Sequence, residues 1–325
     1  MMANAMGPRR LIDVSVHAIG VEAEGIFSFD LRPIDGANLP PFSAGSHINL
    51  LLKNALERSY SLINPLHETH RYMIAVARAP QSTGGSEYIC DAVSVGDTLR
   101  IAEPRNNFPL DEAAKCSVLV AGGIGITPIW SVLQRLQEIG KPWKLFYAAR
   151  TRQRMAFLPK LVELQAQYPD RVCLSFDHEP GYSLLDLPMI VQRQAPGTHF
   201  YCCGPTGMLQ AFEAATAKLD PAAVHIERFS SALPPAQGGF EVCLAKSGRS
   251  FFVPPDKTIL EVLLSAGLQI NRSCMQGVCG TCETHVLEGL PDHRDSVLSK
   301  RERESNKVMM ICCSGARSDK LVLDL

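Results

Sequence analysis

Short runs of alternating apolar and polar residues extend from Leu11 to about Leu110, and Gly, Pro and Asn separate the runs. Successive side chains of a β-strand point to opposite faces, so this alternation indicates short strands with one buried face. Short strands separated by turns are typical of a small antiparallel barrel. The expected strands cover residues 12–16, 25–29, 47–51, 72–76 and 98–101.

The pattern changes near Lys115. An apolar strand at 117–121 leads into a glycine turn, a helix is expected over 128–139, and a strand follows at 144–148. Further strands at 172–176 and 199–203 continue this βαβ rhythm. It predicts an α/β domain with a parallel sheet.

A segment rich in Pro and Gly, 231–239, then interrupts both patterns and is typical of a linker. After it we expect two paired strands at 240–244 and 250–253, a helix at 259–266, and a loop rich in cysteine. The chain is therefore predicted to be multidomain, with an antiparallel β-barrel in 1–112, an α/β domain in 113–230 and a third domain in 240–325.

Composition narrows the function. The 32 basic and 33 acidic residues leave no strongly basic stripe, which disfavours nucleic-acid binding. The longest uncharged run, 116–134, contains glycines and a Thr-Pro step, so it indicates a buried strand, turn and helix and no membrane span. The first ten residues lack the apolar run of a signal peptide. Eleven cysteines scattered along the chain favour a reducing compartment, and we expect a cytoplasmic protein.

Cys274, Cys279 and Cys282 have the spacing C-x4-C-x2-C, and Cys312 stands nearer the C-terminus. Four thiolates in this spacing match a plant-type [2Fe-2S] cluster. Gly277 and Gly280 would let the loop turn its amides toward the sulfurs. A zinc knuckle or buried free thiols are the alternatives, but zinc sites prefer shorter paired spacings.

Two segments of the barrel region have the composition of a phosphate or ring-binding site. Arg58 to Leu62 combines a cation, an aromatic ring and hydroxyl groups, with Arg58, Tyr60 and Leu62 on one face of a strand. Such a segment also occurs by chance. Gly84, Gly85 and Ser86 precede a helical stretch at 87–92, and a helix N-terminus offers free amides to a phosphate.

The α/β region carries two further motifs. The turn Gly122 to Pro128 joins a strand to a helix, where backbone amides can approach a pyrophosphate. Cys203-Gly204-Pro205 ends a strand, and by itself it indicates only a buried cysteine and a tight turn. The pair Arg150-Thr151 follows the strand at 144–148.

Together these motifs resemble the ferredoxin-NADP reductase superfamily, and the domain order is similar to that of the phthalate dioxygenase reductase and vanillate demethylase reductase group. The resemblance covers nearly the whole chain. It implies an FMN-binding barrel, an NAD-binding domain and a C-terminal ferredoxin domain of β-grasp (α+β) fold. FMN is implied over FAD because the ferredoxin part comes last, and NADH is implied over NADPH. Arg152 and Arg154 add positive charge nearby, so a contact with the 2′-phosphate of NADPH stays an alternative.

The resemblance also implies site residues. Ser61 would lie near flavin N5, Thr127 between flavin and nicotinamide, and Cys203 beside nicotinamide C4 as a positioning residue for hydride transfer. The implied FMN contacts are Arg58, Ser59, Tyr60, Ser61, Ala75, Val76, Gly84, Gly85, Ser86, Thr127 and Phe229. The implied NAD contacts are Gly123, Gly125, Arg150, Thr151, Cys203, Gly204 and Pro205.

The implied cluster ligands are Cys274, Cys279, Cys282 and Cys312. The family's Cys-x-Ser pattern selects Cys312 over Cys313, and alternation on a strand would turn Cys313 away. Arg272 and Arg294 are either guides for an acidic partner surface or solvated charges.

Electron counting explains the need for two redox centres, because NADH gives up a hydride whereas an iron–sulfur cluster accepts one electron at a time. A flavin converts between the two. The hypothesis is an NADH-dependent FMN/[2Fe-2S] reductase that supplies a separate terminal oxygenase of the Rieske non-haem iron type, without membrane or nucleic-acid partners. The alternatives are a redox-sensing module and a zinc-bound, flavin-only reductase.

Overall fold

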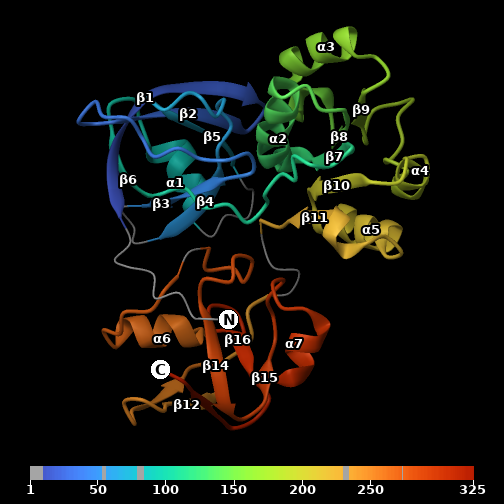
Figure 1. Cartoon of the computed structure of the whole chain (residues 1–325). Helices are drawn as coiled ribbons and strands as arrows, with labels where there is room; N and C mark the ends of the chain where they lie inside the picture. Colours follow the sequence, from blue (N-terminus) through green and yellow to red (C-terminus); the bar gives the residue numbers. More distant parts are fainter. Residues whose placement is uncertain (1–9, 53–55, 79–83, 230–233, 273) are drawn as a thin grey trace. The chain divides into compact units, whose positions relative to one another are not determined.

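The structure is a computed structural model that describes residues 10–52, 56–78, 84–229, 234–272 and 274–325 (Figure 1). It forms two compact units, Met1–Glu227 and Arg228–Leu325. The first unit contains an antiparallel and a parallel sheet, and the second contains a mixed sheet. The predicted multidomain fold class is confirmed, whereas the boundaries at 112/113, 230/231 and 239/240 stay predictions.

The antiparallel sheet has the order β4-β3-β6-β1-β2-β5. A bridge between Leu62 and Ile74 joins its two ends, so the sheet closes into the predicted barrel. Val14, Phe29, Ile48, Leu62 and Ile74 belong to its buried core. The strands are β1 (Leu11–Ala23), β2 (Ile26–Pro33), β3 (His47–Leu51), β4 (Glu57–Ser61), β5 (Tyr72–Ala77) and β6 (Thr98–Ala102), and α1 (Gly85–Ala92) precedes β6.

The parallel sheet has the order β11-β10-β7-β8-β9. Its strands are β7 (Cys116–Gly122), β8 (Trp143–Ala149), β9 (Val172–Phe176), β10 (Thr198–Cys203) and β11 (Val224–Glu227). Its helices are α2 (Ile126–Glu138), α3 (Leu158–Gln167), α4 (Leu187–Gln192) and α5 (Thr206–Thr216), with 3-10 turns η1 (Gly123–Gly125), η2 (Arg152–Arg154) and η3 (Pro221–Ala223).

The strand order of this sheet reverses between β7 and β10. Helices α2 and α3 share a core with Leu119 and Cys203 on one face, whereas α4 and α5 share a core with Val120 and Cys202 on the other (Figure 1). Cys202 and Cys203 therefore point to opposite faces, as neighbouring residues of a strand do. In such a sheet, ligands bind at the carboxyl ends of the strands where the order reverses, which here are the ends of β7 and β10.

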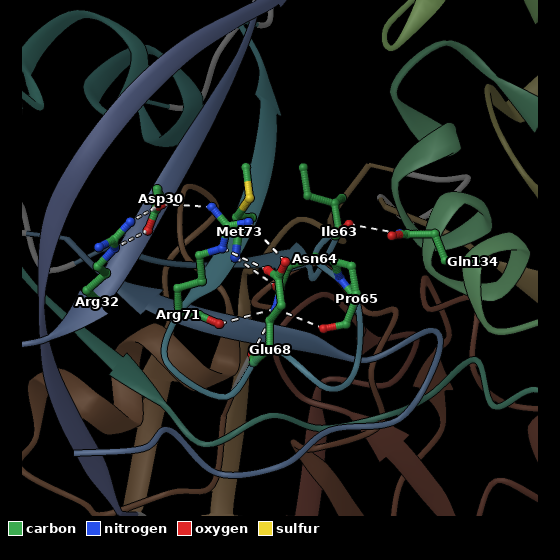
Figure 2. A network of polar contacts seen from close by, with 9 residues as sticks. All are labelled: Asp30, Arg32, Ile63, Asn64, Pro65, Glu68, Arg71, Met73 and Gln134. Carbon is green, nitrogen blue, oxygen red and sulfur yellow. Dashed lines mark hydrogen bonds and ion pairs between the residues drawn. The ribbon is translucent and has the colours of Figure 1, made fainter. Parts of the chain in front are cut away.

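A polar network fixes the segment that follows β4 (Figure 2). The buried Asn64 amide donates to the carbonyls of Pro65, Glu68 and Arg71 at 3.2–3.3 Å, and its oxygen accepts the Met73 amide at 2.9 Å. Gln134 of α2 donates to the Ile63 carbonyl at 2.9 Å.

An ion-pair bridge continues this network. The Arg71 guanidinium pairs with Asp30 at 3.0 Å and with Glu68 at 2.8 Å (Figure 2). The Gln134 bond joins α2 to the segment after β4, and the other contacts tie that segment to β2 and β5. The strand β4 and the helix α2 therefore belong to one unit.

The second unit has the sheet order β13-β12-β18-β14-β16, with β12 and β18 parallel. Ile259, Leu260 and Leu263 of helix α6 are buried in the core of this unit, as expected for a β-grasp domain. The strands are β12 (Phe240–Leu244), β13 (Ser250–Val253), β14 (Glu283–Glu288), β15 (Pro291–Asp292), β16 (Val308–Met310), β17 (Gly315–Ala316) and β18 (Lys320–Leu323), and the helices are α6 (Ile259–Ser265) and α7 (Lys300–Ser305).

Candidate functional site

The four predicted cluster ligands come together in the second unit. Cys274, Cys279 and Cys282 lie in the loop before β14, and Cys312 follows β16. The amides of Gln276 and Val278 donate to the Cys274 sulfur at 3.3 and 3.4 Å. A sulfur that accepts two backbone amides is already in the environment that a thiolate ligand requires.

The thiols are close enough to perturb one another. Hydrogen bonds from the Cys279 and Cys312 thiols lower the pKa of Cys274, and hydrogen bonds with Cys274 and Cys282 raise the pKa of Cys312. Within the described ranges, no three His, Cys, Asp or Glu side chains surround a single point as the ligands of one ion do. A [2Fe-2S] cluster instead distributes four thiolates over two irons, so the donor set fits this group.

One prediction about this loop is wrong. β16 ends at Met310, and 311–313 form a turn, so strand alternation does not separate Cys312 from Cys313. The Cys313 sulfur lies 2.4 Å from the position that a Cβ on Gly277 would occupy. Cys313 is thus packed directly against the cysteine loop, and only the contacts of Cys312 with Cys274 and Cys282 distinguish the two thiols.

The structure brings the two barrel motifs into contact. A Cβ on Gly85 would lie 2.6 Å from Nε of Arg58, so the guanidinium stem passes directly over the start of α1. Gly84 is the N-cap residue of that helix, with a φ of 86°, and it provides no side-chain cap. An arginine beside amides at a helix N-terminus can hold a phosphate. Ser82 and Thr83, which precede this glycine pair in the sequence, lie outside the described residues.

The remaining barrel residues divide between two faces. Ser59 donates to Asn49 at 2.8 Å, Ser61 is buried, and Tyr60 is half-buried against the barrel core. Burial raises the pKa of the Tyr60 hydroxyl, so this ring stays neutral. On β5, Ala75 shares a core with α2, whereas Val76 belongs to the barrel core, so the Val76 side chain faces away from Ala75.

The two motifs of the α/β region also meet. A Cβ on Gly125 would lie 2.2 Å from the carbonyl oxygen of Cys203, and a Cβ on Gly122 would lie 2.6 Å from Pro205. Thr127 is buried in the first turn of α2, where its hydroxyl donates to the Ile124 carbonyl at 3.0 Å. Because Gly122 and Gly125 have no side chains, the end of β10 can approach the turn after β7, where the strand order reverses. A pyrophosphate and a nicotinamide bound there would need this close approach.

Two of the three arginines that follow β8 form ion pairs with carboxylates. Arg150 is exposed at the end of the strand, where its carbonyl accepts the His178 amide at 2.9 Å. The Arg152 guanidinium lies 4.3 Å from the centre of the Phe176 ring and pairs with Glu179 at 3.8 Å. Arg154 pairs with Glu24 at 3.1 Å. Both cations considered for a 2′-phosphate therefore already have carboxylate partners.

Sequence reasoning missed Glu227, a partly buried acid whose carboxyl group lies beside Cys203. Glu227 ends β11 directly beside Cys203 in the parallel register. Its Oε2 atom is buried without a hydrogen-bond partner among the described residues, and burial raises its pKa to about 8. Burial also raises the pKa of the Cys203 thiol, and the Glu227 charge contributes. A lone acid at a strand end looks solvated in the sequence, so only the pairing of β10 with β11 identifies it.

Phe229 follows β11 and has an exposed ring. It belongs to the second unit, so its predicted contact with the flavin stays a prediction. Arg294 pairs with Asp292 at 2.6 Å, which reduces the charge available to a partner.

Comparisons with known proteins agree with these features. The family described as an oxidoreductase NAD-binding domain matches residues 119–214, and the 2Fe-2S iron-sulfur cluster binding domain matches residues 244–317. Phenoxybenzoate dioxygenase subunit beta of Ectopseudomonas oleovorans is 50% identical over 315 residues, covering 97% of both chains. Tetrachlorobenzoquinone reductase of Sphingobium chlorophenolicum is 49% identical over 321 residues, covering 98% of this chain and 99% of the relative.

Fold and site thus define an oxidoreductase with an NAD-binding domain and an iron–sulfur domain. The solved structure of phthalate dioxygenase reductase aligns with a TM-score of 0.81 and 36% identity over 97% of this chain and 98% of that chain. The Burkholderia cepacia enzyme of that name is 39% identical over 306 residues, covering 93% of this chain and 94% of the relative. The chain belongs to the phthalate dioxygenase reductase family.

Membership confirms the predicted reductase function and its cofactors, FMN, NADH and a [2Fe-2S] cluster. A zinc knuckle and a zinc-bound, flavin-only reductase are thereby set aside. No described helix combines the length and the apolar character needed to cross a membrane.

Proposed function

We propose that this chain is the reductase component of a multicomponent oxygenase or demethylase, and that its electron acceptor is a terminal oxygenase of the Rieske non-haem iron type. One observation carries the proposal, the coexistence of three features in one chain. They are a cradle formed by Arg58 and the start of α1, a glycine turn against Cys203, and the cysteine loop with Cys312. Relatives over almost the full length are named as reductases or subunits of dioxygenase systems, which supports an oxygenase partner.

In this proposal, FMN lies on the barrel. Arg58 and the amides at Gly85 and Ser86 hold its phosphate, and Tyr60 covers its ring. The other contacts are Ser59, Ser61, Ala75, the Val76 backbone, Gly84, Thr127 and Phe229. The contact between Arg58 and Gly85 supports this assignment, because a side chain at position 85 would fill the cradle.

NADH is proposed to lie along the carboxyl ends of β7, β8 and β10. Gly123 and Gly125 would supply backbone amides to the pyrophosphate, Arg150 and Thr151 would contact a ribose, and Cys203 with Gly204 and Pro205 would support the nicotinamide. Bound FMN would supply the chemistry that converts the hydride of NADH into single electrons for the cluster. The protein residues align the two rings and exclude water; Cys203, fully buried with a raised pKa, remains a neutral thiol and acts by its shape.

Cys274, Cys279, Cys282 and Cys312 are the proposed cluster ligands. None of the eleven cysteines, all of which are among the described residues, forms a disulfide, which supports a reducing compartment. We propose the cytoplasm. The proposed function is tested by reconstitution. With NADH, the purified chain should reduce cytochrome c but leave aromatic substrates unchanged, and it should support turnover when a Rieske oxygenase is added. Substrate oxidation by the chain alone would refute the division of labour.

The 49% identity to tetrachlorobenzoquinone reductase favours a second candidate function, direct reduction of a quinone. A quinone can take two electrons from a reduced flavin without a protein partner. Steady-state rates with a halogenated benzoquinone and with a Rieske oxygenase, measured at equal reductase concentration, separate the two candidates. A Cys279→Ser variant sharpens the comparison, since only delivery to the oxygenase should require the cluster.

A further inference from the structure

The peptide that joins Gly277 to Val278 makes hydrogen bonds on both of its sides. Its carbonyl oxygen accepts the Ser296 amide at 2.8 Å, and its N–H donates to the Cys274 sulfur at 3.4 Å. The N–H and C=O of a trans peptide lie in one plane and point in opposite directions. The position of Ser296 therefore determines whether the Val278 amide points at the sulfur.

Gly277 makes this peptide easy to rotate. It has a φ of 67°, in a region that glycine enters without steric cost. A Cβ there would lie 2.4 Å from the Cys313 sulfur and 3.1 Å from Cα of Asp295. The loop therefore depends on a glycine for close packing, and an external contact must supply the restraint that a side chain would otherwise give.

Asp295 supplies that restraint from within the second unit. Its side chain is fully buried, and Oδ2 accepts the amides of Val297 at 3.0 Å and Leu298 at 2.8 Å. Arg303 donates to the Asp295 carbonyl at 2.7 Å. A carboxylate that accepts the amides two and three residues ahead holds its own segment in a turn, and this turn presents the Ser296 N–H to Gly277.

We propose that Asp295 is a positioning residue for the iron–sulfur cluster, and that it acts through Ser296 and the Gly277–Val278 peptide to aim an N–H donor at Cys274. An N–H dipole directed at a ligand sulfur stabilises the reduced, more negative cluster and so raises its reduction potential. This inference rests on the proposed ligand Cys274. It means that Asp295, which lies outside the cysteine motif, helps to set the reduction potential of the cluster.

The negative charge of Asp295 lowers the reduction potential of the cluster, whereas its proposed positioning of the Val278 N–H raises it. Two substitutions separate these effects. Asp295→Asn keeps an oxygen that can accept the Val297 and Leu298 amides and removes the negative charge, so its potential should equal or exceed that of the wild type. Asp295→Ala removes the charge and also the turn. Its potential should therefore fall below that of Asp295→Asn, and a value equal to or above it overturns the proposal.

Resonance Raman spectra give a readout independent of activity. Transfer from H2O to D2O should shift the Fe–S(Cys) bands in the wild type and in Asp295→Asn, and the shift should shrink in Asp295→Ala. Ser296→Pro keeps Asp295 but deletes the N–H that Gly277 accepts, and it should lower the potential as well. An unchanged isotope shift in both Asp295→Ala and Ser296→Pro contradicts the proposal.

Thr258→Ala is the matched control. The Thr258 hydroxyl accepts the Glu261 amide at 3.2 Å and caps α6 in the same unit, so this variant loses a similar contact away from the cysteine loop. It should keep the wild-type potential; an equal shift would mean general loosening and refute the proposal. Iron and sulfide are measured first. If the wild-type protein holds no iron and sulfide, the assignment of the cluster ligands is refuted. If Asp295→Ala holds the cluster and has the same reduction potential as Asp295→Asn, only the proposed role of Asp295 is refuted.

Discussion

Gly125 and Cys203 pack so closely that a methyl group on the glycine would lie 2.2 Å from the cysteine carbonyl oxygen. This contact joins the turn after β7 to the end of β10, where the strand order reverses. The proposed nicotinamide position depends on it, because the two segments would separate if the turn carried a side chain.

Gly125→Ala should therefore push the turn away from β10. Overpacking of this kind costs about 1–3 kcal/mol of stability, and kcat/KM for NADH should fall because the nicotinamide support moves. Gly207→Ala is the control, since a Cβ there meets nothing within 4 Å in helix α5; it should preserve the kinetics. NADH kinetics and thermal unfolding of both variants check the prediction, and wild-type kcat/KM in Gly125→Ala would contradict it.

Arg58→Ala should weaken FMN retention. The guanidinium passes over the start of α1, and a hydrogen bond to a charged group contributes about 1.5–3 kcal/mol. The FMN dissociation constant should therefore rise on the order of 10- to 100-fold. Arg100→Ala, which removes an exposed pair with Asp13, should leave that constant unchanged. Fluorescence titration of apoprotein measures both, and equal affinities would remove Arg58 from the site.

Cys279→Ser should separate the two redox functions. The variant is expected to lose iron and sulfide and to lose cytochrome c reduction, while NADH still bleaches the flavin in stopped-flow experiments. Cys243→Ser replaces a cysteine on β12 outside the loop and should behave as wild type. Loss of flavin reduction together with the cluster would show that the two sites are not independent.

Glu227 should give the first unit a measurable pH dependence. Burial raises its folded-state pKa from 4.5 to about 8, so the fold favours the protonated carboxyl. The stabilising contribution is complete below pH 4.5 and is lost as the pH rises through about 8. Glu227→Gln does not ionise, so its Tm relative to the wild type should increase between about pH 5 and pH 9, by about 2–4 °C for each 1 kcal/mol. A constant difference would contradict the raised pKa of this acid.

Local patterns were enough to predict most strands and the motifs. Strands 47–51, 172–176 and 240–244 appear at their predicted positions because alternation and turn residues are local signals. Helix α2 begins at Ile126, two residues before the predicted start at 128, and its first turn includes Thr127.

Non-local packing explains what the sequence did not reveal. Arg58 meets Gly85 only because the barrel closes. The Oε2 atom of Glu227 is buried only because β11 pairs with β10, and Cys313 faces the cysteine loop because β16 ends early. None of these contacts has a signature in neighbouring residues, so no periodicity or motif could predict them.

An anaerobic titration of the purified chain with NADH, followed by visible absorption and by EPR, tests the proposed electron path most directly. We expect one FMN for each [2Fe-2S] cluster, flavin bleaching by NADH, and a reduced-cluster EPR signal that appears with it. Protein that holds iron and sulfide and whose flavin bleaches, but which never develops that signal, would contradict electron transfer from NADH through the flavin to the cluster.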